Sequence, residues 1–210
     1  MDINWLGHSC FSIKGSNVTA LTDPYSPECG YTLGKPTADI VTVSHQHAGH
    51  SFTSSIDGEP RIVTRPGEYE IKGVLIIGIA AFHDNKRGEQ LGKNNVYLME
   101  IDEISICHLG DLGHALTAEQ AEEIGSVDVL MIPVGGISTI NAAVAAEIIR
   151  QLSPNITIPM HYQTPVLKQE LEPVDNFLKE IGSDPVEPLP KLSITKSTLP
   201  PIPQICLLNY

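Results

Sequence analysis

The stretch His45-Gln46-His47-Ala48-Gly49-His50 places three histidines on one short segment. It follows residues 40–43, an apolar run that is typical of a buried strand. A strand that ends in this string presents three imidazoles on one loop, and neutral imidazole is the commonest protein ligand for zinc and similar metals. The string therefore predicts a metal site at a strand end. The glycine at position 49 complicates this interpretation, because a carboxylate there would supply a further ligand.

Other histidines also follow apolar runs that resemble strands. They are His83 after residues 74–82, His108 after residues 104–107, and His161 after residues 156–160. Active sites gather where strand ends meet loops, because a rigid sheet fixes the backbone of each ligand while the loops aim the side chains. Repeated placement of histidine at strand ends predicts that these rings converge on one metal centre.

The first half of the chain has the short apolar runs and turn signals of β-structure. We predict strands near residues 3–5, 10–13, 18–21, 40–43, 61–64, 68–71, 74–82, 96–101 and 104–108. Their close spacing favours antiparallel hairpins.

The second half changes to an alternation of strands and helices. Thr117 and Asn141 are typical N-caps, which predict helices to about residue 124 and over residues 142–152. The other predicted elements are strands at 127–132, 156–160 and 204–208, and a helix over about 166–181. This order is compatible with helices outside two packed sheets. With no linker or repeat, we predict one domain over residues 1–210.

Composition limits the classes of function. The chain has 210 residues, 41% of them hydrophobic, and a formal net charge of −12, which disfavours nucleic acid and anionic membranes as partners. Its four scattered cysteines are interpreted as free thiols in a reducing compartment. No leader-like segment is visible, and the longest apolar run is too short to cross a bilayer, so we expect a cytoplasmic protein.

Longer motifs around the histidines resemble the metallo-β-lactamase superfamily, in particular its small metal-dependent hydrolases related to ascorbate-6-phosphate lactonase. The motifs are Trp5-Leu6-Gly7-His8-Ser9-Cys10-Phe11, Leu21-Thr22-Asp23-Pro24, Val43-Ser44-His45-Gln46-His47-Ala48-Gly49-His50, Leu109-Gly110-Asp111-Leu112-Gly113 and Ile158-Pro159-Met160-His161-Tyr162. Together they cover nearly the whole chain. The resemblance implies an α/β fold, the four-layer αββα sandwich.

The resemblance also implies a ligand set for one or two divalent metal ions. The residues that match by position are His45, His47 and His83 for the first metal, and position 49, His50 and His161 for the second. Asp111 matches the aspartate that bridges both metals, and His108 is the alternative to His83. Zinc is the first expectation, with manganese, iron or nickel as alternatives, because histidine-rich sites discriminate poorly between them.

The resemblance implies an aspartate ligand at position 49, so the glycine there would leave the second metal one ligand short. Three outcomes would relieve the uncompensated charge: one metal only, another carboxylate in its place, or an anionic substrate. The candidate carboxylates are Asp23, Glu68 and Asp84. His8 lies in a turn between strands. It could equally well support the metal ligands by contacting them or make a purely structural hydrogen bond.

We predict a metal-dependent hydrolase that uses metal-bound hydroxide on a small ester, lactone or phosphodiester. Asp111 would orient the hydroxide, with His108 or His114 as acid, and Lys86 and Arg87 would bind an anionic substrate. The alternatives are a metal-binding member of the fold without catalysis and a nuclease-type phosphodiesterase. We expect a small molecule as the partner, without nucleic acid or membrane, and a homo-oligomer stays open.

Overall fold

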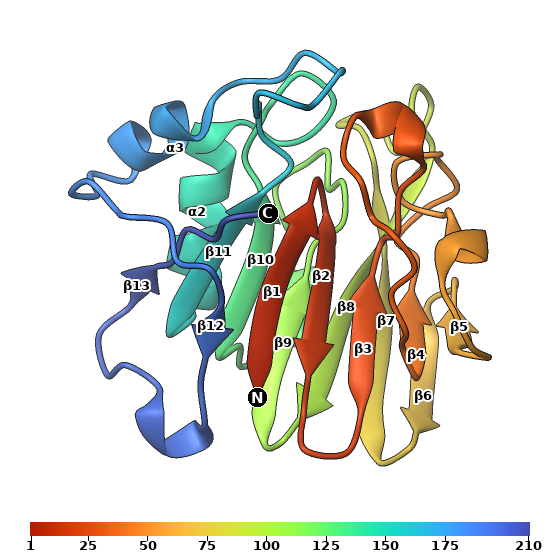
Figure 1. Cartoon of the computed structure of the whole chain (residues 1–210). Helices are drawn as coiled ribbons and strands as arrows, with labels where there is room; N and C mark the ends of the chain where they lie inside the picture. Colours follow the sequence, from red (N-terminus) through yellow and green to blue (C-terminus); the bar gives the residue numbers. More distant parts are fainter.

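The computed structural model describes all residues 1–210 and builds two mixed β-sheets that pack face to face (Figure 1). The first sheet has the strand order β12-β1-β2-β3-β4-β5. Its strands are β1 (Asp2–Gly7), β2 (Cys10–Lys14), β3 (Thr19–Thr22), β4 (Ile40–Thr42), β5 (Arg61–Val63) and β12 (Leu192–Ser193).

The second sheet has the strand order β13-β11-β10-β9-β8-β7-β6. Its strands are β6 (Gly67–Ile71), β7 (Val74–Phe82), β8 (Lys93–Ile101), β9 (Ile104–His108), β10 (Val129–Pro133), β11 (Ile156–Met160) and β13 (Gln204–Ile205). The antiparallel half of this sheet runs from β6 to β9, and β9, β10, β11 and β13 are parallel. The predicted strand over 204–208 is therefore shorter than expected.

One region of the first sheet differs from the predicted hairpins. Strands β3, β4 and β5 pair in parallel, because residues 23–39 and 43–60 are long enough to carry the chain back to the starting edge. Parallel strands end at the same edge of a sheet, so the residues that follow β3 and β4 become neighbours. The histidine string lies in the second of these crossovers.

The main hydrophobic core joins buried residues of both sheets with residues of the helices, from Ile3 to Leu208. Tyr97 on β8 crosses this core, and its buried hydroxyl lies 3.1 Å from the carbonyl oxygen of Val43 and 3.3 Å from that of Val63. A shared core supports our proposal of one domain over residues 1–210.

The two outer faces of the sandwich are covered differently. Helix α2 (Ala142–Leu152) buries one apolar face, and it contacts α3 (Val174–Glu180); α1 (Ala118–Ile124) lies near β7. On the first sheet, Leu21 and Val41 belong to a separate cluster with Tyr25 and Tyr31. Loops and short 3₁₀ turns thus form the outer layer on that side. The two-sheet α/β sandwich predicted from the resemblance is confirmed.

The helix caps were predicted correctly, but one helix is shorter than predicted. Thr117 and Gln120 form a capping box, and the Asn141 side chain accepts a hydrogen bond from the backbone N–H of Val144. Helix α3 begins at Val174 instead of residue 166, because Pro173 cannot donate the i→i−4 hydrogen bond and restricts the residue before it. None of the three helices has the length and apolarity that crossing a membrane requires.

Candidate metal centre

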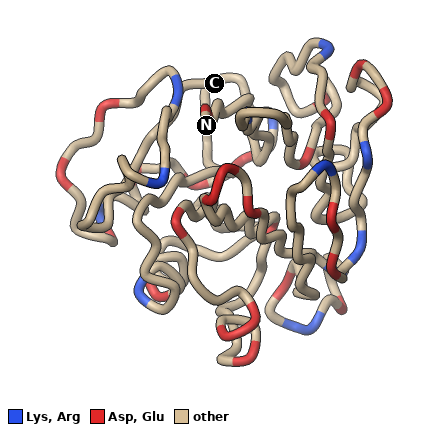
Figure 2. The backbone as a smooth tube through the Cα atoms, turned by 90° about the horizontal axis from the view of Figure 1, so that it is seen from below, with Lys and Arg blue, Asp and Glu red and all other residues tan.

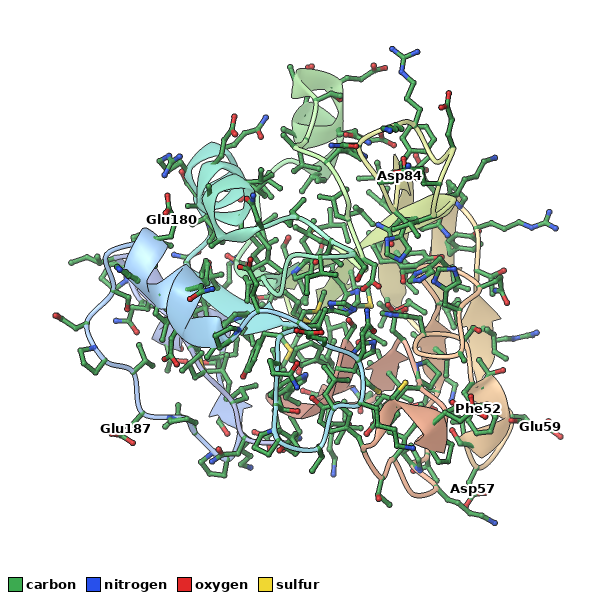
Figure 3. All side chains as sticks on the ribbon, turned by 90° about the horizontal axis from the view of Figure 1, so that it is seen from above. Phe52, Asp57, Glu59, Asp84, Glu180 and Glu187 are labelled. Atoms are coloured by element: carbon green, nitrogen blue, oxygen red, sulfur yellow. The ribbon has the colours of Figure 1, made fainter.

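The loops at one edge of the sandwich gather the predicted ligands, and Figure 3 looks down on this edge. The side chains come from the β1–β2 turn, from the loops after β4, β7 and β9, and from the residue after β11; they are His8, His45, His47, His50, His83, Asp111 and His161. The backbone at this edge is unusual, because His8 and His161 have φ values of 54° and 51°. Non-glycine residues rarely adopt such angles, and those that do cluster at functional sites.

Asp111 lies at the centre of the group and is buried. Its Oδ2 atom faces the Nε2 atoms of four rings, at 3.0 Å from His50, 3.2 Å from His161, 3.3 Å from His83 and 3.9 Å from His45. The second oxygen, Oδ1, is buried without a hydrogen-bond partner. The sequence motifs that were predicted to meet at one point are therefore brought together by the fold.

Two sets of histidines that could each hold a metal ion surround this carboxylate, and we call them the first and second ligand groups. The first ligand group is His45, His47 and His83, whose nearest ring nitrogens all lie within 4.8 Å of one another. Nε2 of His45 is 2.9 Å from Nδ1 of His47, and the ring of His47 is exposed. This group opens towards solvent on the His47 side.

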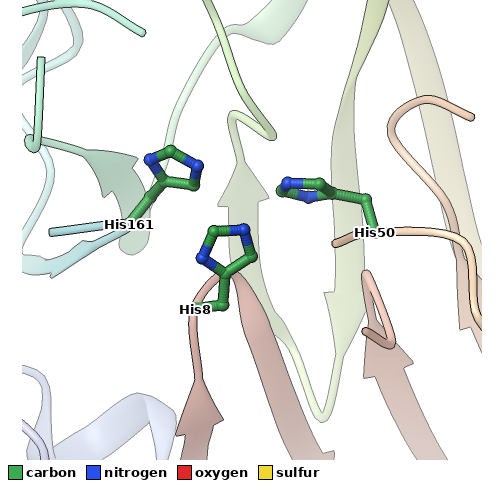
Figure 4. A group of neighbouring side chains, drawn as sticks. All are labelled: His8, His50 and His161. Atoms are coloured by element: carbon green, nitrogen blue, oxygen red, sulfur yellow. The ribbon is translucent and has the colours of Figure 1, made fainter. Parts of the chain in front are cut away.

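The second ligand group is His8, His50 and His161, and all three rings are buried. Figure 4 shows them converging from three different parts of the fold. The ring centroid of His8 lies 4.8 Å from that of His50 and 4.4 Å from that of His161. The sequence alone is compatible with two roles for His8, because a lone histidine in a turn carries no signal of which residues it will face.

Asp23 and Ser44 fix the orientation of two rings, which sequence reasoning did not foresee. Asp23 Oδ1 accepts a hydrogen bond from the Ser44 backbone N–H at 2.7 Å, and Asp23 Oδ2 accepts one from the Ser44 hydroxyl at 2.6 Å. With its hydrogen directed at Asp23, Ser44 Oγ must accept from His45 Nδ1, 2.9 Å away. His45 therefore turns the lone pair of Nε2 towards the centre.

His50 is held by the same carboxylate. Its Nδ1 atom donates to Asp23 Oδ2 over 2.9 Å, so Nε2 is left to face Asp111. A partner of this kind behind a metal-ligating histidine sets the tautomer and raises the basicity of the ligand. Asp23 thus touches one ring directly and a second through Ser44.

The electrostatics of the buried rings favour neutral imidazole. Burial lowers the pKa of His45 to about 3 and lowers the pKa of His8 well below its usual value. His50 differs: burial alone would lower its pKa, but Asp111 and Asp23 outweigh burial and raise that pKa to about 10. Burial opposes ionisation of Asp111, yet His161 and His50 hold its pKa well below the usual range.

The residues at this centre fit a divalent metal. One carboxylate oxygen cannot satisfy four ring nitrogens, and neutral rings that present lone pairs to a carboxylate repel it. A cation among these atoms removes the conflict, and imidazole with carboxylate is a ligand set that zinc and similar metals use. The buried, unpartnered Oδ1 of Asp111 supplies one more oxygen that can coordinate a metal.

A cavity of about 250 Å³ opens beside the cluster. The residues that line it are His8, Cys29, His47, Gly49, His50, His83, Leu91, Asp111, Ser138 and Gln169. Asp111 is the only carboxylate among them. Ser138 and Gln169 form a polar side of the cavity, where Gln169 Nε2 donates to Ser138 Oγ over 3.2 Å.

Two histidines predicted as acids do not line this cavity. His108 is fully buried, with Nε2 2.9 Å from the Ser9 carbonyl oxygen and Nδ1 accepting from the Gly110 backbone N–H. His114 accepts from the Phe82 backbone N–H through Nε2. Both rings are therefore engaged with backbone, and His83, not His108, stands beside His45 and His47.

The other predicted contacts also lie outside the cavity. Glu68 lies on β6 beside a different depression of the surface. Asp84 accepts four backbone N–H bonds within its own loop, from Lys86, Gly88, Gln90 and Leu91, and it is labelled at the rim in Figure 3. The side chains of Lys86 and Arg87 are exposed on that loop and do not line the cavity.

Comparisons with known proteins assign the family. A profile of the beta-lactamase superfamily domain matches residues 2–161. The chain belongs to the beta-lactamase superfamily. The resemblance drawn from the motifs is thereby confirmed.

Two relatives show the same assignment over most of the chain. A UPF0173 metal-dependent hydrolase of Methanoculleus marisnigri is 30% identical, covering 82% of this chain and 86% of the relative. A structure from Thermotoga maritima, described as a candidate Zn-dependent hydrolase of the metallo-β-lactamase superfamily, is 41% identical with a TM-score of 0.83, covering 99% and 97% of the two chains. The predicted enzyme class, a metal-dependent hydrolase, is confirmed.

A more distant structure shows the fold alone. The isothiocyanate hydrolase from Delia radicum gut bacteria is 12% identical, with a TM-score of 0.68 over 93% of this chain and all of that one. This similarity shows that the two proteins share the sandwich fold, and it does not identify a substrate.

Proposed function

We propose that this hydrolase cleaves a small anionic ester, lactone or phosphodiester at a centre of two divalent ions, with zinc as the first candidate. The observation that carries the proposal is the single oxygen of Asp111 faced by four ring nitrogens within 3.9 Å. A divalent ion held there lowers the pKa of a coordinated water towards ~7 and so supplies a nucleophile at neutral pH.

The protein's own residues divide the work of holding and orienting. In our proposal His45, His47 and His83 hold one ion, His50 and His161 hold the other, and Asp111 reaches both. Asp23 and Ser44 keep the rings of His50 and His45 in the tautomer that coordinates. We leave His108 out of the catalytic set, because both of its ring nitrogens are engaged with backbone.

The size of the cavity supports a small substrate. Pockets for small molecules typically range from about 300 to 1,000 Å³, and this cavity of about 250 Å³ lies just below that range. A polynucleotide fits neither this volume nor a surface whose acidic residues are spread around the molecule (Figure 2). The nuclease alternative therefore gains no support.

The charge of the centre supports an anionic substrate. Two divalent ions bring four positive charges, and Asp111 is the only carboxylate that lines the cavity. The rings beside it are neutral when they coordinate. A negatively charged group on the substrate would offset the excess positive charge, although the chain as a whole carries −12.

Lys86 and Arg87 keep a smaller role in the proposal. They lie on the loop whose Leu91 lines the cavity, and their side chains extend into solvent. Exposed charges attract an anion through solvent, so they would assist encounter more than binding.

The test is a substrate screen with matched variants. The chain is loaded with zinc, manganese or iron and assayed against aryl esters, lactones and phosphodiesters, each in neutral and anionic form. His45→Ala should lose activity on every substrate together with one metal equivalent, whereas Glu68→Gln, which removes a carboxylate outside the cavity, should match the wild type.

The anionic form of a substrate should have the higher kcat/KM. Hydrolysis that survives in His45→Ala at the wild-type rate would contradict the proposal. A metal-loaded wild type that is inactive on all three classes would instead favour the non-catalytic alternative.

A further inference from the structure

The space beside Gly49 is already filled by another side chain. A Cβ atom built on Gly49 would lie 2.9 Å from Nε2 of His8, closer than real Cβ contacts. The backbone of Gly49 is not in a left-handed conformation that would by itself demand glycine. The His8 ring therefore occupies the space that a side chain at position 49 would need.

The His8 ring is fixed in this place by its own backbone. The His8 carbonyl oxygen accepts hydrogen bonds from Trp5 Nε1 at 3.0 Å and from the backbone N–H of His161 at 3.1 Å. The second bond joins the β1–β2 turn directly to the end of β11. Two members of the second ligand group are thus locked together through the main chain.

The ring itself is buried with an unpaired nitrogen. The ring is only 3% exposed, its Nδ1 atom is buried without a hydrogen-bond partner, and it lines the cavity beside Asp111. Burying an unpaired polar group is costly unless something else satisfies it. Figure 4 shows the ring directed into the gap between His50 and His161, where a metal would satisfy it.

We infer that His8 is a ligand of the second metal and takes the place of the carboxylate that position 49 does not supply. This rests on the metal centre proposed above, but it does not depend on hydrolysis. The second ion is then held by His8, His50, His161 and Asp111. None of Asp23, Glu68 and Asp84 replaces the missing aspartate, because a neutral imidazole does.

The exchange has an electrostatic consequence. A neutral ring in place of a carboxylate leaves the centre one unit more positive than a centre with aspartate at position 49. Zinc accepts imidazole as readily as carboxylate, so the site keeps its ligand number and loses only negative charge. The extra positive charge is available to an anionic substrate.

The experiment is a double-mutant cycle on positions 8 and 49, read out by metal content and by cobalt(II) titration. His8→Asn is the single variant, because asparagine tolerates the left-handed backbone at φ 54°. Lys72→Asn is its matched control: Lys72 has φ 52° and lies outside the cavity. The other arms are Gly49→Asp and the double variant, with thermal unfolding measured on all.

We expect two metal equivalents in the wild type and in Lys72→Asn. His8→Asn should keep one and bind the second at least about 100-fold more weakly, more than the 10–100-fold that loss of a residue behind a ligand produces. The double variant should bind the second ion within about tenfold of the wild type. Gly49→Asp alone should bind it more weakly, because its side chain meets the His8 ring.

The cobalt spectra separate a ligand from a structural residue. With His8 as a ligand, His8→Asn removes one paramagnetically shifted imidazole resonance and alters the visible absorption, whereas a structural role lowers only the melting temperature. Two tight equivalents with an unchanged spectrum in His8→Asn would overturn the inference, and so would tighter binding in Gly49→Asp alone. An inactive wild type with the expected metal contents would overturn the proposed substrate class and leave this inference standing.

Discussion

The two ligand groups around Asp111 are built in opposite ways. The first group, His45, His47 and His83, includes an exposed ring and takes two of its three members from one short string. The second group, His8, His50 and His161, is wholly buried, and its members come from three separate segments. The difference shows that local sequence builds the solvent-facing side of the centre, whereas long-range packing builds the buried side.

Burial gives the two sides different tolerance to change. Water can replace a lost ligand on the exposed side, because His47 already opens on solvent. On the buried side a lost ligand leaves an unsatisfied ion among apolar and neutral groups, which costs more. The four predictions below use this contrast, and they run from the largest expected effect to the smallest.

Replacing Asp111 should abolish the contrast, because both groups share this residue. Asp111→Asn keeps the shape but removes the only carboxylate of the cavity. We expect loss of metal from both positions and a fall in kcat/KM of about 10³-fold or more, which corresponds to several kcal/mol of lost stabilisation. Metal analysis and the hydrolysis assay measure the two effects. Retention of both equivalents would contradict the central place given to this carboxylate.

Asp23 and Ser44 should separate the two groups. Asp23 contacts His50 directly and His45 through Ser44, so Asp23→Asn should weaken both metals by about 10–100-fold. Ser44→Ala removes the acceptor of His45 and one donor to Asp23 but leaves the Asp23–His50 bond in place, so it should weaken the first metal more than the second. Sequential cobalt(II) titration distinguishes the two variants, and an equal effect of Ser44→Ala on both sites would show that the groups are not independent.

Asp84 should affect the stability of its own loop, residues 84–91, more than metal binding by either ligand group. Four backbone N–H groups, the Leu91 N–H foremost, hold the pKa of Asp84 well below its usual 3.8. Asp84→Asn loses half of its acceptor capacity, so we expect the melting temperature to fall by about 2–5 °C at pH 7, with little change in metal content.

The pH dependence of that effect has a definite sign. A carboxyl whose pKa is lowered in the folded state stabilises it above the unfolded pKa, and this stabilisation fades as the pH falls. The difference in melting temperature between wild type and Asp84→Asn should therefore shrink as the pH drops below about 3.8. A difference that is constant from pH 7 to pH 3 would assign the effect to packing.

Removing the charges of Lys86 and Arg87 should have the smallest effect. The double variant Lys86→Gln/Arg87→Gln should raise KM for an anionic substrate about two- to threefold at low salt and leave kcat unchanged. The difference should vanish at 0.5 M salt, where salt ions screen the attraction between exposed charges and the substrate. A tenfold or larger change would place these side chains in direct contact with the substrate.

Much of the fold and centre was predictable because strongly patterned segments carry their own signal. The Thr117 and Asn141 caps and the buried strand 156–160 lie where the sequence predicted them. The parallel pairing of β3, β4 and β5 was not predicted, since spacing alone does not say how a long loop returns. Pro173 did carry a signal against the long helix, which the apolar pattern outweighed.

The sequence by itself determined the superfamily, the enzyme class and the chemistry of the donor set, because these depend on residue types in a fixed order. Only the tertiary structure decided which groups face which. It turned His108 onto the Ser9 carbonyl, placed Asp23 behind His50 and, through Ser44, behind His45, and brought His8 into the space that Gly49 leaves. These contacts join residues far apart in the chain, and their distances follow from how the two sheets pack rather than from any local pattern.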